Sequence, residues 1–405
     1  MRKLSLLSQI VKQSAIRQML KEVADLRLKG IDVIQLSTGQ PSLPIDEQVF
    51  EETVAEMRKN RLLASSYTPT KGLRSVLEAI QNDLKVFGNI DVSLDEIVIT
   101  EGATEGLLLT DFAILDRDDE IIIMDPSYVS YAQDAIIAGA KPILVEQKMD
   151  EGYQPNINRI LEHITPKTKA ILVATPDNPT GRVINKETAK ALLDIAEDHD
   201  LWFIVDEAYK HLIYEGEHYW FWRESRARER TICVNTFSKD PAMTGFRLGY
   251  VYGPKEVIAA IEKFKQYSTL SSNTPAQIAA TIYLRPEVKK RILEYTLRIY
   301  RSRRDKIYES FKEYLPEANA HYPEGAMYMF ANLNEYLRKA NMNDQQLMLG
   351  LVREKHVAIV AGSSFGETGK NHMRFTFVGE NEERIEKGMK LLREFIDEKT
   401  VNASK

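Results

Sequence analysis

The middle of the chain alternates short apolar runs with amphipathic stretches. Seven runs rich in β-branched residues begin near residue 95. Polar positions hardly interrupt them, as is typical of strands buried on both faces. The runs are Glu96–Thr100, Glu120–Met124, Pro142–Val145, Ala170–Ala174, Trp202–Val205, Thr231–Val234 and Phe246–Tyr252. Because helical patterns separate most of them, the sequence predicts an α/β fold with a mainly parallel, seven-stranded sheet flanked by helices.

The two ends of the chain follow a different pattern. Residues 287–314 form one long, highly charged helical stretch, and short apolar runs then lead to a final amphipathic helix near 380–398. The first 45 residues also lie outside the sheet pattern. Single cores stop growing at about 250–300 residues. We therefore predict a large domain over residues 46–286 and a smaller α+β domain formed by residues 1–45 and 287–405.

The N-terminal stretch has two interpretations. Its first 20 residues contain four basic residues, and no acidic residue precedes Glu22, which is typical of a transit peptide. Apolar positions from Ile16 to Leu28 recur at helical spacing, and Gly30 follows them as a stop signal. The spacing favours an ordinary helix.

Charge and composition exclude several classes of function. The 54 basic and 59 acidic residues give a formal net charge of −5, which provides no attraction to nucleic acid or anionic lipid. No run approaches the roughly 18 consecutive apolar residues of a membrane span. The single cysteine, Cys233, cannot form an internal disulfide, which favours a reducing compartment. We expect a cytoplasmic protein with no nucleic-acid or membrane partner and no metal.

Two strand ends of the predicted sheet are followed by features that suit an anion. Ligands of parallel α/β sheets collect beyond the carboxyl ends of the strands. After Ile97–Thr100, small residues including Gly102 open a helix, whose free N–H groups suit a phosphate. After Ala170–Ala174, an Asn-Pro-Thr-Gly turn leaves the Asn178 amide at the strand end. Taken singly, ordinary turns explain both features better.

Two further strand ends carry ionisable side chains. Asp206 directly follows a buried run, where a carboxylate is costly unless a cation or donors meet it, and Tyr209 can reach the same ligand. Lys239 follows the run that ends at Val234, and a lysine in a cationic cleft can have a lowered pKa and form a Schiff base. Arg247 offers a planar fork suited to phosphate. Singly, a helix-capping aspartate and a solvated lysine are the commoner explanations.

Together these residues form a set suited to a phosphorylated pyridine aldehyde. The chain resembles the fold-type I aminotransferases of class I/II, the aspartate/aromatic aminotransferase-like enzymes that depend on pyridoxal 5′-phosphate (PLP). The resemblance covers about residues 4–395, and its most specific motifs are PDNPTG (176–181), VDEAY (205–209) and SKDPAMTGFRLGY (238–250).

The resemblance implies a role for each matching residue. Lys239 resembles the lysine that forms the Schiff base and moves the proton, and Asp206 the partner of the pyridinium nitrogen. Asn178 and Tyr209 resemble the donors to the phenolic oxygen of the ring, and Tyr128 the aromatic residue that stacks on it. The expected phosphate contacts are Gly102, Ala103, Thr104, Thr236 and Arg247.

The resemblance also implies substrate contacts and a homodimer. Arg374 resembles the arginine that clamps the α-carboxylate of the substrate, and Gly39 the glycine whose backbone meets that group. Tyr128 and Asn178 are expected to border the substrate as well. Tyr67 matches a tyrosine that reaches the cofactor phosphate of the neighbouring subunit. Lys12 is either a substrate contact or a solvated lysine at a helix end.

Three positions depart from the commoner family pattern. Tyr128 stands where many relatives have tryptophan, and Thr236 where many have serine. Asp240-Pro241 follows Lys239, where relatives often have threonine or alanine and then an aromatic residue. These departures affect the detailed pocket around the lysine and not its chemistry.

The expected reaction is transfer of the amino group of an L-amino acid to a 2-oxo acid, with 2-oxoglutarate as the expected acceptor. The same residues also serve β-lyases, cyclising synthases and oxidases, so these remain alternatives. A PLP-dependent regulator would carry a DNA-binding domain first, whereas the resemblance begins within the first dozen residues. A catalytically silent relative is disfavoured by Lys239, Asp206 and Arg247. The pattern leaves the side chain of the amino-acid substrate open.

Overall fold

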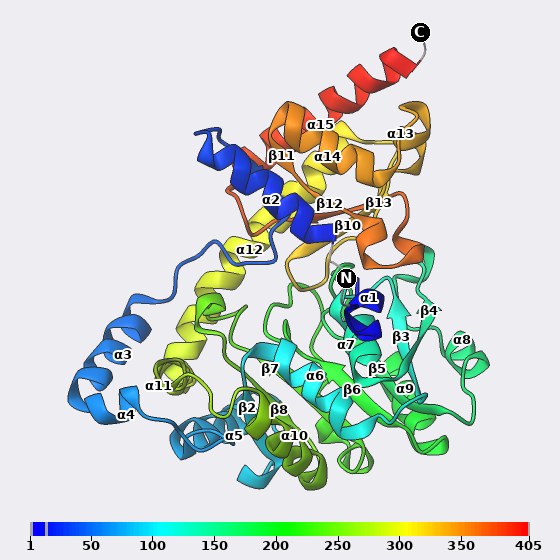
Figure 1. Ribbon diagram of the computed structural model, residues 1–405. Helices are drawn as coiled ribbons and strands as arrows, with labels where there is room; N and C mark the ends of the chain where they lie inside the picture. Colours follow the sequence, from blue (N-terminus) through cyan, green and yellow to red (C-terminus); the bar gives the residue numbers. More distant parts are fainter. Residues whose placement is uncertain (1–2, 13–14, 404–405) are drawn as a thin grey trace.

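The computed structural model describes residues 3–12 and 15–403. Figure 1 shows two bodies, one built on the large sheet and one that contains the later part of the chain together with α2 (Ala15–Leu28). The long helix α12 (Pro286–Tyr314) runs from one body to the other. Its N-terminal part packs in the core of the large body through Val288 and Ile292, and its C-terminal part in the other core through Ile307 and Phe311.

The large body contains a seven-stranded sheet in the order β2-β8-β7-β6-β5-β3-β4. β8 is antiparallel to both of its neighbours, and the other pairs are parallel. The strands are β2 (Ile97–Thr100), β3 (Glu120–Asp125), β4 (Lys141–Glu146), β5 (Thr168–Ala174), β6 (Trp202–Asp206), β7 (Thr231–Thr236) and β8 (Gly249–Tyr252). The predicted fold class is confirmed.

Helices cover both faces of this sheet. Successive residues of a strand enter different cores: Ile171 and Val173 of β5 pack on one side, and Leu172 and Ala174 on the other. This double burial explains the unbroken apolar runs in the sequence. One face is covered by α6 (Gly102–Ile114), α7 (Ser130–Ala138) and α10 (Lys255–Ser268). The other is covered by α5 (Arg74–Gly88), α8 (Ile157–Glu162), α9 (Lys186–Asp198) and α11 (Thr274–Tyr283).

One predicted strand begins later than expected. The run Phe246–Tyr252 is a strand only from Gly249, because residues 244–246 form a 3-10 turn and Arg247 has a φ of 51°. A residue in this left-handed conformation cannot continue a strand.

The smaller body is a mixed α/β unit. Its four-stranded antiparallel sheet has the order β12-β13-β10-β9, and a separate parallel pair joins β1 to β11. The strands are β1 (Ile34–Gln35), β9 (Asn319–Ala320), β10 (Tyr328–Asn332), β11 (Val357–Ala358), β12 (Val360–Ala361) and β13 (His372–Thr376). The accompanying helices are α2, α13 (Asn334–Lys339), α14 (Asp344–Lys355) and α15 (Glu382–Ala403).

The remaining N-terminal helices are α1 (Leu6–Ile10), α3 (Glu47–Lys59) and α4 (Arg61–Ser65). α1 lies beside α7 of the large body (Figure 1), where the backbone N–H of Lys12 donates to Gln133 at 2.9 Å. Tyr209 and Leu212 lie within residues 46–286 and yet pack in the core of the smaller body. The domain division at residues 46 and 286 therefore stays a prediction. Among the described residues, no helix combines the length and apolarity needed to cross a membrane.

Candidate active site

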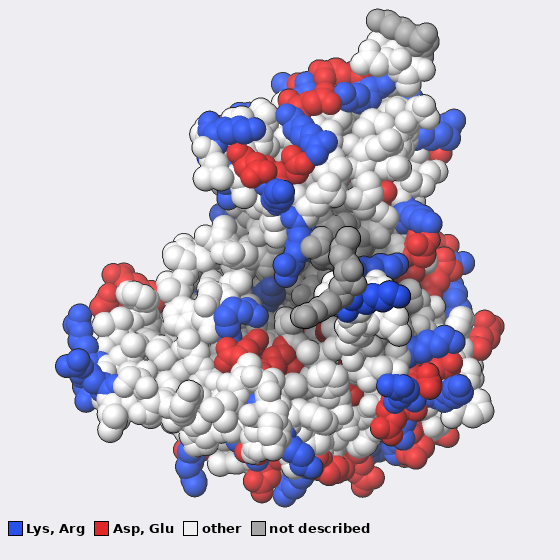
Figure 2. Space-filling view, viewed as in Figure 1, with Lys and Arg blue, Asp and Glu red and all other residues white. Residues whose placement is uncertain are grey.

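A cleft of about 480 Å³ lies between the two bodies, at the carboxyl ends of the central parallel strands. Figure 2 shows a hollow in this region with Lys and Arg side chains at its rim. Most of the predicted site residues line it: Gly39, Ala103, Thr104, Tyr128, Asn178, Asp206, Tyr209, Thr236, Lys239, Arg247 and Arg374. Segments far apart in the sequence therefore form one site.

Lys239 is the lysine of the cleft. Its Nζ donates to the carbonyl of Gly39 at 2.8 Å and lies 5.4 Å from the centre of the Tyr209 ring. Burial, together with the positive charges of Arg374 and Arg247, lowers its pKa to about 8, although Asp206 acts in the opposite direction. The lowered pKa gives this amine a larger neutral, nucleophilic fraction than a solvated lysine has at the same pH.

Asp240, which departs from the family pattern directly after Lys239, has its hydrogen-bond partner outside the cleft. The Asp240 carboxylate does not line the cleft and accepts from the Tyr283 hydroxyl at 2.6 Å. Burial raises the pKa of this carboxyl. The Asp240 side chain therefore does not line the cleft, whereas Lys239 does.

Asp206 ends β6 with its carboxylate buried. One oxygen accepts from the Tyr131 hydroxyl at 2.7 Å, and the other from the backbone N–H of Ala208 at 2.9 Å. Burial raises the pKa of the carboxyl, while these two hydrogen bonds and nearby Lys239 act to lower it. Among the described residues, two donors and no cation contact this carboxylate, which suits the binding of a positively charged ligand group.

Arg374 of β13 joins the two bodies at the cleft. Its Nη1 donates to Asn178 Oδ1 at 3.0 Å, and its Nη2 to the carbonyl of Ser37 at 2.8 Å. The guanidinium lies 4.2 Å from the centre of the Tyr328 ring, which orients it. Nε of this buried arginine has no hydrogen-bond partner among the described residues. The site therefore holds an N–H donor ready for an anion.

The N-terminus of α6 faces Arg247. Gly102 has a φ of 77°, and a Cβ added there would lie 2.9 Å from Arg247 Nη2, so glycine keeps this space open. The Glu105 carboxylate accepts from the backbone N–H of Glu101 at 2.7 Å and from Lys265 at 3.0 Å, which fixes the first turn of the helix. Free N–H groups and a guanidinium on two sides of one space suit a phosphate.

The aromatic residues complete the walls. Tyr128 packs edge-on against Tyr131 with ring centres 5.5 Å apart. The hydroxyl of Tyr209 shares a hydrogen bond of 2.8 Å with that of Tyr328, and burial raises the Tyr209 pKa well above its usual value. The Thr236 hydroxyl donates to Ser238 Oγ at 2.9 Å. Thr236 thus keeps a hydroxyl at the rim of the cleft.

Gly102 lies beside Arg247 but is not itself one of the residues that line the cleft, and two further predicted site residues do not line it either. Tyr67 is 84% exposed and does not line the cleft. Lys12 does not line it either, and its charge acts on the surface carboxylate of Glu367, whose pKa it helps to lower. A residue that acts on a neighbouring subunit would also be exposed in a single chain, so the position of Tyr67 agrees with the role predicted for it.

Sequence reasoning missed two contributors to the site. Arg17, with Ile16 beside it, lines the cleft from the start of α2. Tyr131 donates to Asp206. Tyr128 precedes α7 (Ser130–Ala138) and Tyr131 lies in its first turn, so no periodic pattern in the sequence marked Tyr131 as a partner of Asp206. Nothing in the helical pattern of residues 16–28 distinguished Arg17 from a solvated residue.

The side chains fit PLP, the cofactor that the resemblance implies. A buried carboxylate without a direct cation suits a protonated pyridine nitrogen, and the space that Gly102 leaves beside Arg247 suits a phosphate. An amine with a lowered pKa suits an aldehyde. The residues that would hold the group therefore lie in one cleft.

Comparisons with known proteins agree with this geometry. The family model for aminotransferase class I and II matches residues 31–392. The chain is 33% identical to aspartate aminotransferase of Pyrococcus horikoshii over 378 residues, which cover 93% of each chain. It is 34% identical to aspartate/prephenate aminotransferase of Thermus thermophilus over 390 residues, covering 96% and 97% of the two chains. The structure of Thermus thermophilus aspartate aminotransferase with maleate superposes with a TM-score of 0.91 at 33% identity, covering 98% and 100%.

Proposed function

Because this chain belongs to aminotransferase class I and II, and is therefore a PLP-dependent aminotransferase, we propose that Lys239 carries the cofactor as a Schiff base. The observation that supports this proposal most strongly is the position of Lys239. It is a buried amine with a pKa lowered to about 8, in the cleft that also contains Asp206 and Arg247. The predictions of family, cofactor and amino-group transfer are confirmed by the comparisons.

We propose that the strand-end residues hold the cofactor. Asp206 would pair with its ring nitrogen, and Tyr131 would keep the carboxylate in place. Asn178 and Tyr209 would donate to its phenolic oxygen, and Tyr128 would stack on its ring. The phosphate would lie between the N-terminus of α6 and Arg247, bounded by Gly102, Ala103, Thr104 and Thr236.

We propose separate roles in the reaction for Lys239, Arg374 and Gly39. When bound, the cofactor supplies an electron sink for the bond that breaks at the substrate α-carbon. Lys239 Nζ would act as the base that takes the proton from this carbon and would then deliver it to the cofactor carbon that carries the aldehyde. Arg374 binds the α-carboxylate, and Asn178 and the carbonyl of Ser37 orient its guanidinium. Gly39 would lie beside this carboxylate, and its carbonyl accepts from Lys239 at 2.8 Å, which holds the free amine in the cleft.

The proposed donor is an acidic L-amino acid, and the proposed acceptor is 2-oxoglutarate. The relatives named above act on aspartate, and a dicarboxylate needs a second cation in addition to Arg374. Arg17 supports this choice because it lines the cleft and makes no ion pair with any residue in the described ranges. We propose that Arg17, rather than Lys12, faces the side-chain carboxylate.

The cofactor site can be tested directly. Borohydride reduction of the purified enzyme, followed by peptide mapping, should place the reduced cofactor on the peptide that contains Lys239. Lys239→Ala should remove the label and the activity. A label on any other lysine would contradict the assignment.

The substrate can be tested by a screen of the twenty amino acids, each with and without 2-oxoglutarate. Aspartate or glutamate should react fastest, and oxo-acid formation should require the second oxo acid. Product without the acceptor would instead favour a β-lyase, cyclising synthase or oxidase reaction. Arg17→Met should lower kcat/KM for acidic substrates about 10-fold or more and leave alanine within about twofold. Lys12→Met is the matched control and should leave both unchanged.

We further propose a homodimer in the cytoplasm. The exposed Tyr67 supports the dimer, as discussed below. The one cysteine of the sequence, Cys233, is buried and free, which agrees with a reducing compartment.

A further inference from the structure

Arg182 is a fully buried cation that does not line the cleft. Its exposed fraction is 0%, and it follows the PDNPTG turn in the loop after β5. A buried charge is costly unless acceptors surround it. The contacts proposed for cofactor and substrate do not involve it, so its presence needs a separate explanation.

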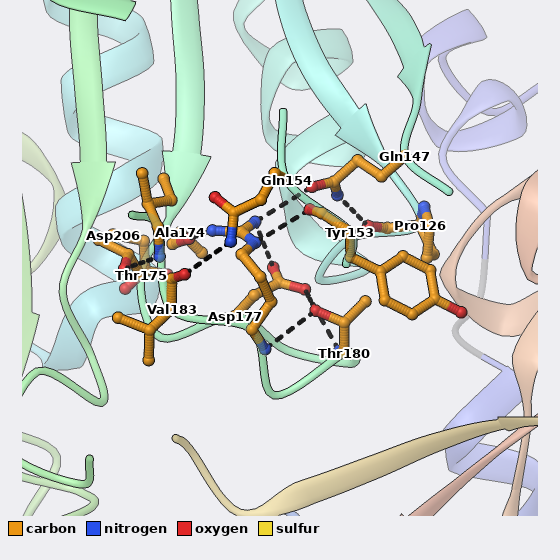
Figure 3. A network of polar contacts seen from close by, with 12 residues as sticks. Pro126, Gln147, Tyr153, Gln154, Ala174, Thr175, Asp177, Thr180, Val183 and Asp206 are labelled. Carbon is orange, nitrogen blue, oxygen red and sulfur yellow. Dashed lines mark hydrogen bonds and ion pairs between the residues drawn. The ribbon is translucent and has the colours of Figure 1, made fainter. Parts of the chain in front are cut away.

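The guanidinium satisfies acceptors on three separate segments. Nη1 donates to the carbonyl of Ala174 at 2.8 Å, Nε to the carbonyl of Tyr153 at 3.1 Å, and Nη2 to Gln147 Oε1 at 3.1 Å. In Figure 3 the side chain of Gln147 and the carbonyls of Ala174 and Tyr153 surround a common centre. A planar fork meets these acceptors with three different nitrogens, whereas a lysine carries all its donors on one nitrogen.

One of these segments carries cleft residues, and a second contacts another segment that does. Ala174 ends β5, four positions before Asn178. Gln147 connects Arg182 to a further loop, because its Nε2 donates to the carbonyl of Pro126 at 3.1 Å, two positions before Tyr128. Arg182 therefore links the loop of Asn178 to the loop of Tyr128.

Asp177 closes the turn that presents Asn178. Its Oδ2 accepts from the backbone N–H and the hydroxyl of Thr180, at 3.2 and 2.5 Å. Its backbone N–H donates to the carbonyl of Arg182 at 2.9 Å, and its Oδ1 lies 3.9 Å from Arg182 Nη2. The carboxylate that shapes the turn thus depends on the charge of Arg182, and Asn178 is the next residue.

The smaller body attaches to the same turn. The carbonyl of Gly181 accepts from the backbone N–H groups of Glu324 and Gly325 at 3.0 and 2.9 Å, and the N–H of Val183 donates to Glu324 Oε2 at 2.8 Å. Arg374 of this body donates to Asn178. A displaced turn would therefore move Asn178 and the groups that orient Arg374.

We infer that Arg182 is a positioning residue for this aminotransferase: it fixes Asn178 and Tyr128 relative to Arg374 without contacting cofactor or substrate. The inference rests on the roles proposed above for those three residues. Loss of the fork would leave the loops after β3, β4 and β5 without their common tie, and a displacement near 1 Å can cost up to about 100-fold in function.

The test compares Arg182→Met with Arg182→Lys and with a stability control. The control is Leu392→Ala in α15, which removes a buried side chain from the core of the smaller body, away from the turn. Each variant is measured for melting temperature, for the dissociation constant of PLP from the cofactor-free protein, and for KM and kcat with the fastest amino acid of the screen.

Arg182→Met should raise both the PLP dissociation constant and KM about 10-fold or more. Arg182→Lys should fall between it and the wild type, because an ammonium group meets only some of the acceptors. Leu392→Ala should lower the melting temperature and leave both constants within about twofold. If Arg182→Met lowers the melting temperature like the control and leaves both constants unchanged, the positioning role is wrong.

Two further measurements separate the possible failures. If Arg182→Met does not fold, Gln147→Leu removes only the link to Pro126 and should raise the same constants severalfold; unchanged constants would overturn the inference. If Arg374→Ala leaves KM unchanged, the proposed clamp is wrong, and the PLP dissociation constant alone then decides the role of Arg182.

Discussion

Lys239 and Asp206 illustrate what single residues in this cleft require from their surroundings. Burial acts on both: it lowers the pKa of the amine and raises that of the carboxyl. The sequence predicts both residues because each follows an apolar run, and the ends of parallel strands meet at one edge of the sheet. It could not predict the Tyr131 hydroxyl on Asp206 or the Gly39 carbonyl on Lys239, since these contacts depend on how helix and loop approach the strands.

The lowered pKa of Lys239 predicts a pH-dependent difference in stability. In the cofactor-free protein the buried amine loses its proton near pH 8, before the unfolded chain does near 10.5. The cost of burying the charge is therefore complete below pH 8 and fades as the pH rises to about 10.5. Lys239→Met should accordingly gain about 3 kcal/mol relative to wild type between pH 10.5 and pH 7. Urea unfolding at both pH values measures this.

The matched control for that measurement is Lys190→Met on α9, which changes an exposed lysine. Its unfolding free energy should follow that of the wild type at both pH values. Parallel curves for wild type and Lys239→Met would mean that the amine is not held in its charged form against burial.

Arg374→Ala should weaken every amino-acid substrate alike, because the α-carboxylate is common to all of them. Loss of a contact to a desolvated charge costs about 2–5 kcal/mol, so kcat/KM should fall about 30-fold or more for aspartate and alanine equally. Arg17→Met provides the contrast, since its effect should be confined to acidic substrates. A loss confined to acidic substrates in Arg374→Ala would place this arginine at the side-chain end of the cleft.

At the scale of elements, the termini matter more than the interiors. β6 and β7 each deliver a reactive residue at or just beyond their last residue, and α6 delivers its N-terminus. The periodicity predicts these elements because burial on both faces leaves a strong apolar signal. It placed the start of β8 too early, since a left-handed residue such as Arg247 leaves no mark in an apolar pattern.

The N-terminus of α6 gives a prediction with a matched control. Gly102→Ala adds a Cβ that would lie 2.9 Å from Arg247 Nη2, so the guanidinium must move out of the proposed phosphate space. The dissociation constant of PLP should rise about 10-fold or more. Gly152→Ala has a similar φ of 64° but meets nothing within 4 Å.

Both alanines carry the backbone cost of a left-handed residue, about 1 kcal/mol. Both should therefore lose stability in thermal unfolding, and only Gly102→Ala should lose cofactor affinity, measured by equilibrium dialysis. Equal affinities for PLP in the two variants would mean that the phosphate does not bind at the N-terminus of α6.

At the scale of the whole molecule, the site exists only because two bodies meet. Ser37, Asn178 and Arg374 lie far apart in the sequence and are joined by two hydrogen bonds of Arg374. No local pattern contains that information, and the family resemblance alone supplied the pairing of Arg374 with the cleft. The same holds for Arg182, whose three acceptors are spread over 28 residues of chain, from Gln147 to Ala174.

The exposed surface near α4 supports a second copy of the chain. Leu62 in α4 is 78% exposed, and Tyr67, two residues after this helix, is 84% exposed, although both are large apolar or aromatic residues. Large exposed side chains of this kind mark interaction surfaces when they gather. We therefore predict that the active enzyme is a homodimer in which Tyr67 completes the phosphate site of the partner subunit.

Mixing two inactive variants tests whether the sites are shared. One is a Tyr67 variant that no longer holds cofactor, such as Tyr67→Asp, and the other is Lys239→Ala. If Tyr67 acts across the interface, a mixed dimer has one site with both lesions and one site with neither. Half of the dimers are mixed after statistical exchange, so activity should recover to about a quarter of the wild-type value. Lys239→Ala mixed with Asp206→Asn is the control and should recover nothing, because both residues line the cleft of one chain. No recovery in the Tyr67 mixture after demonstrated exchange would mean that Tyr67 acts within its own chain.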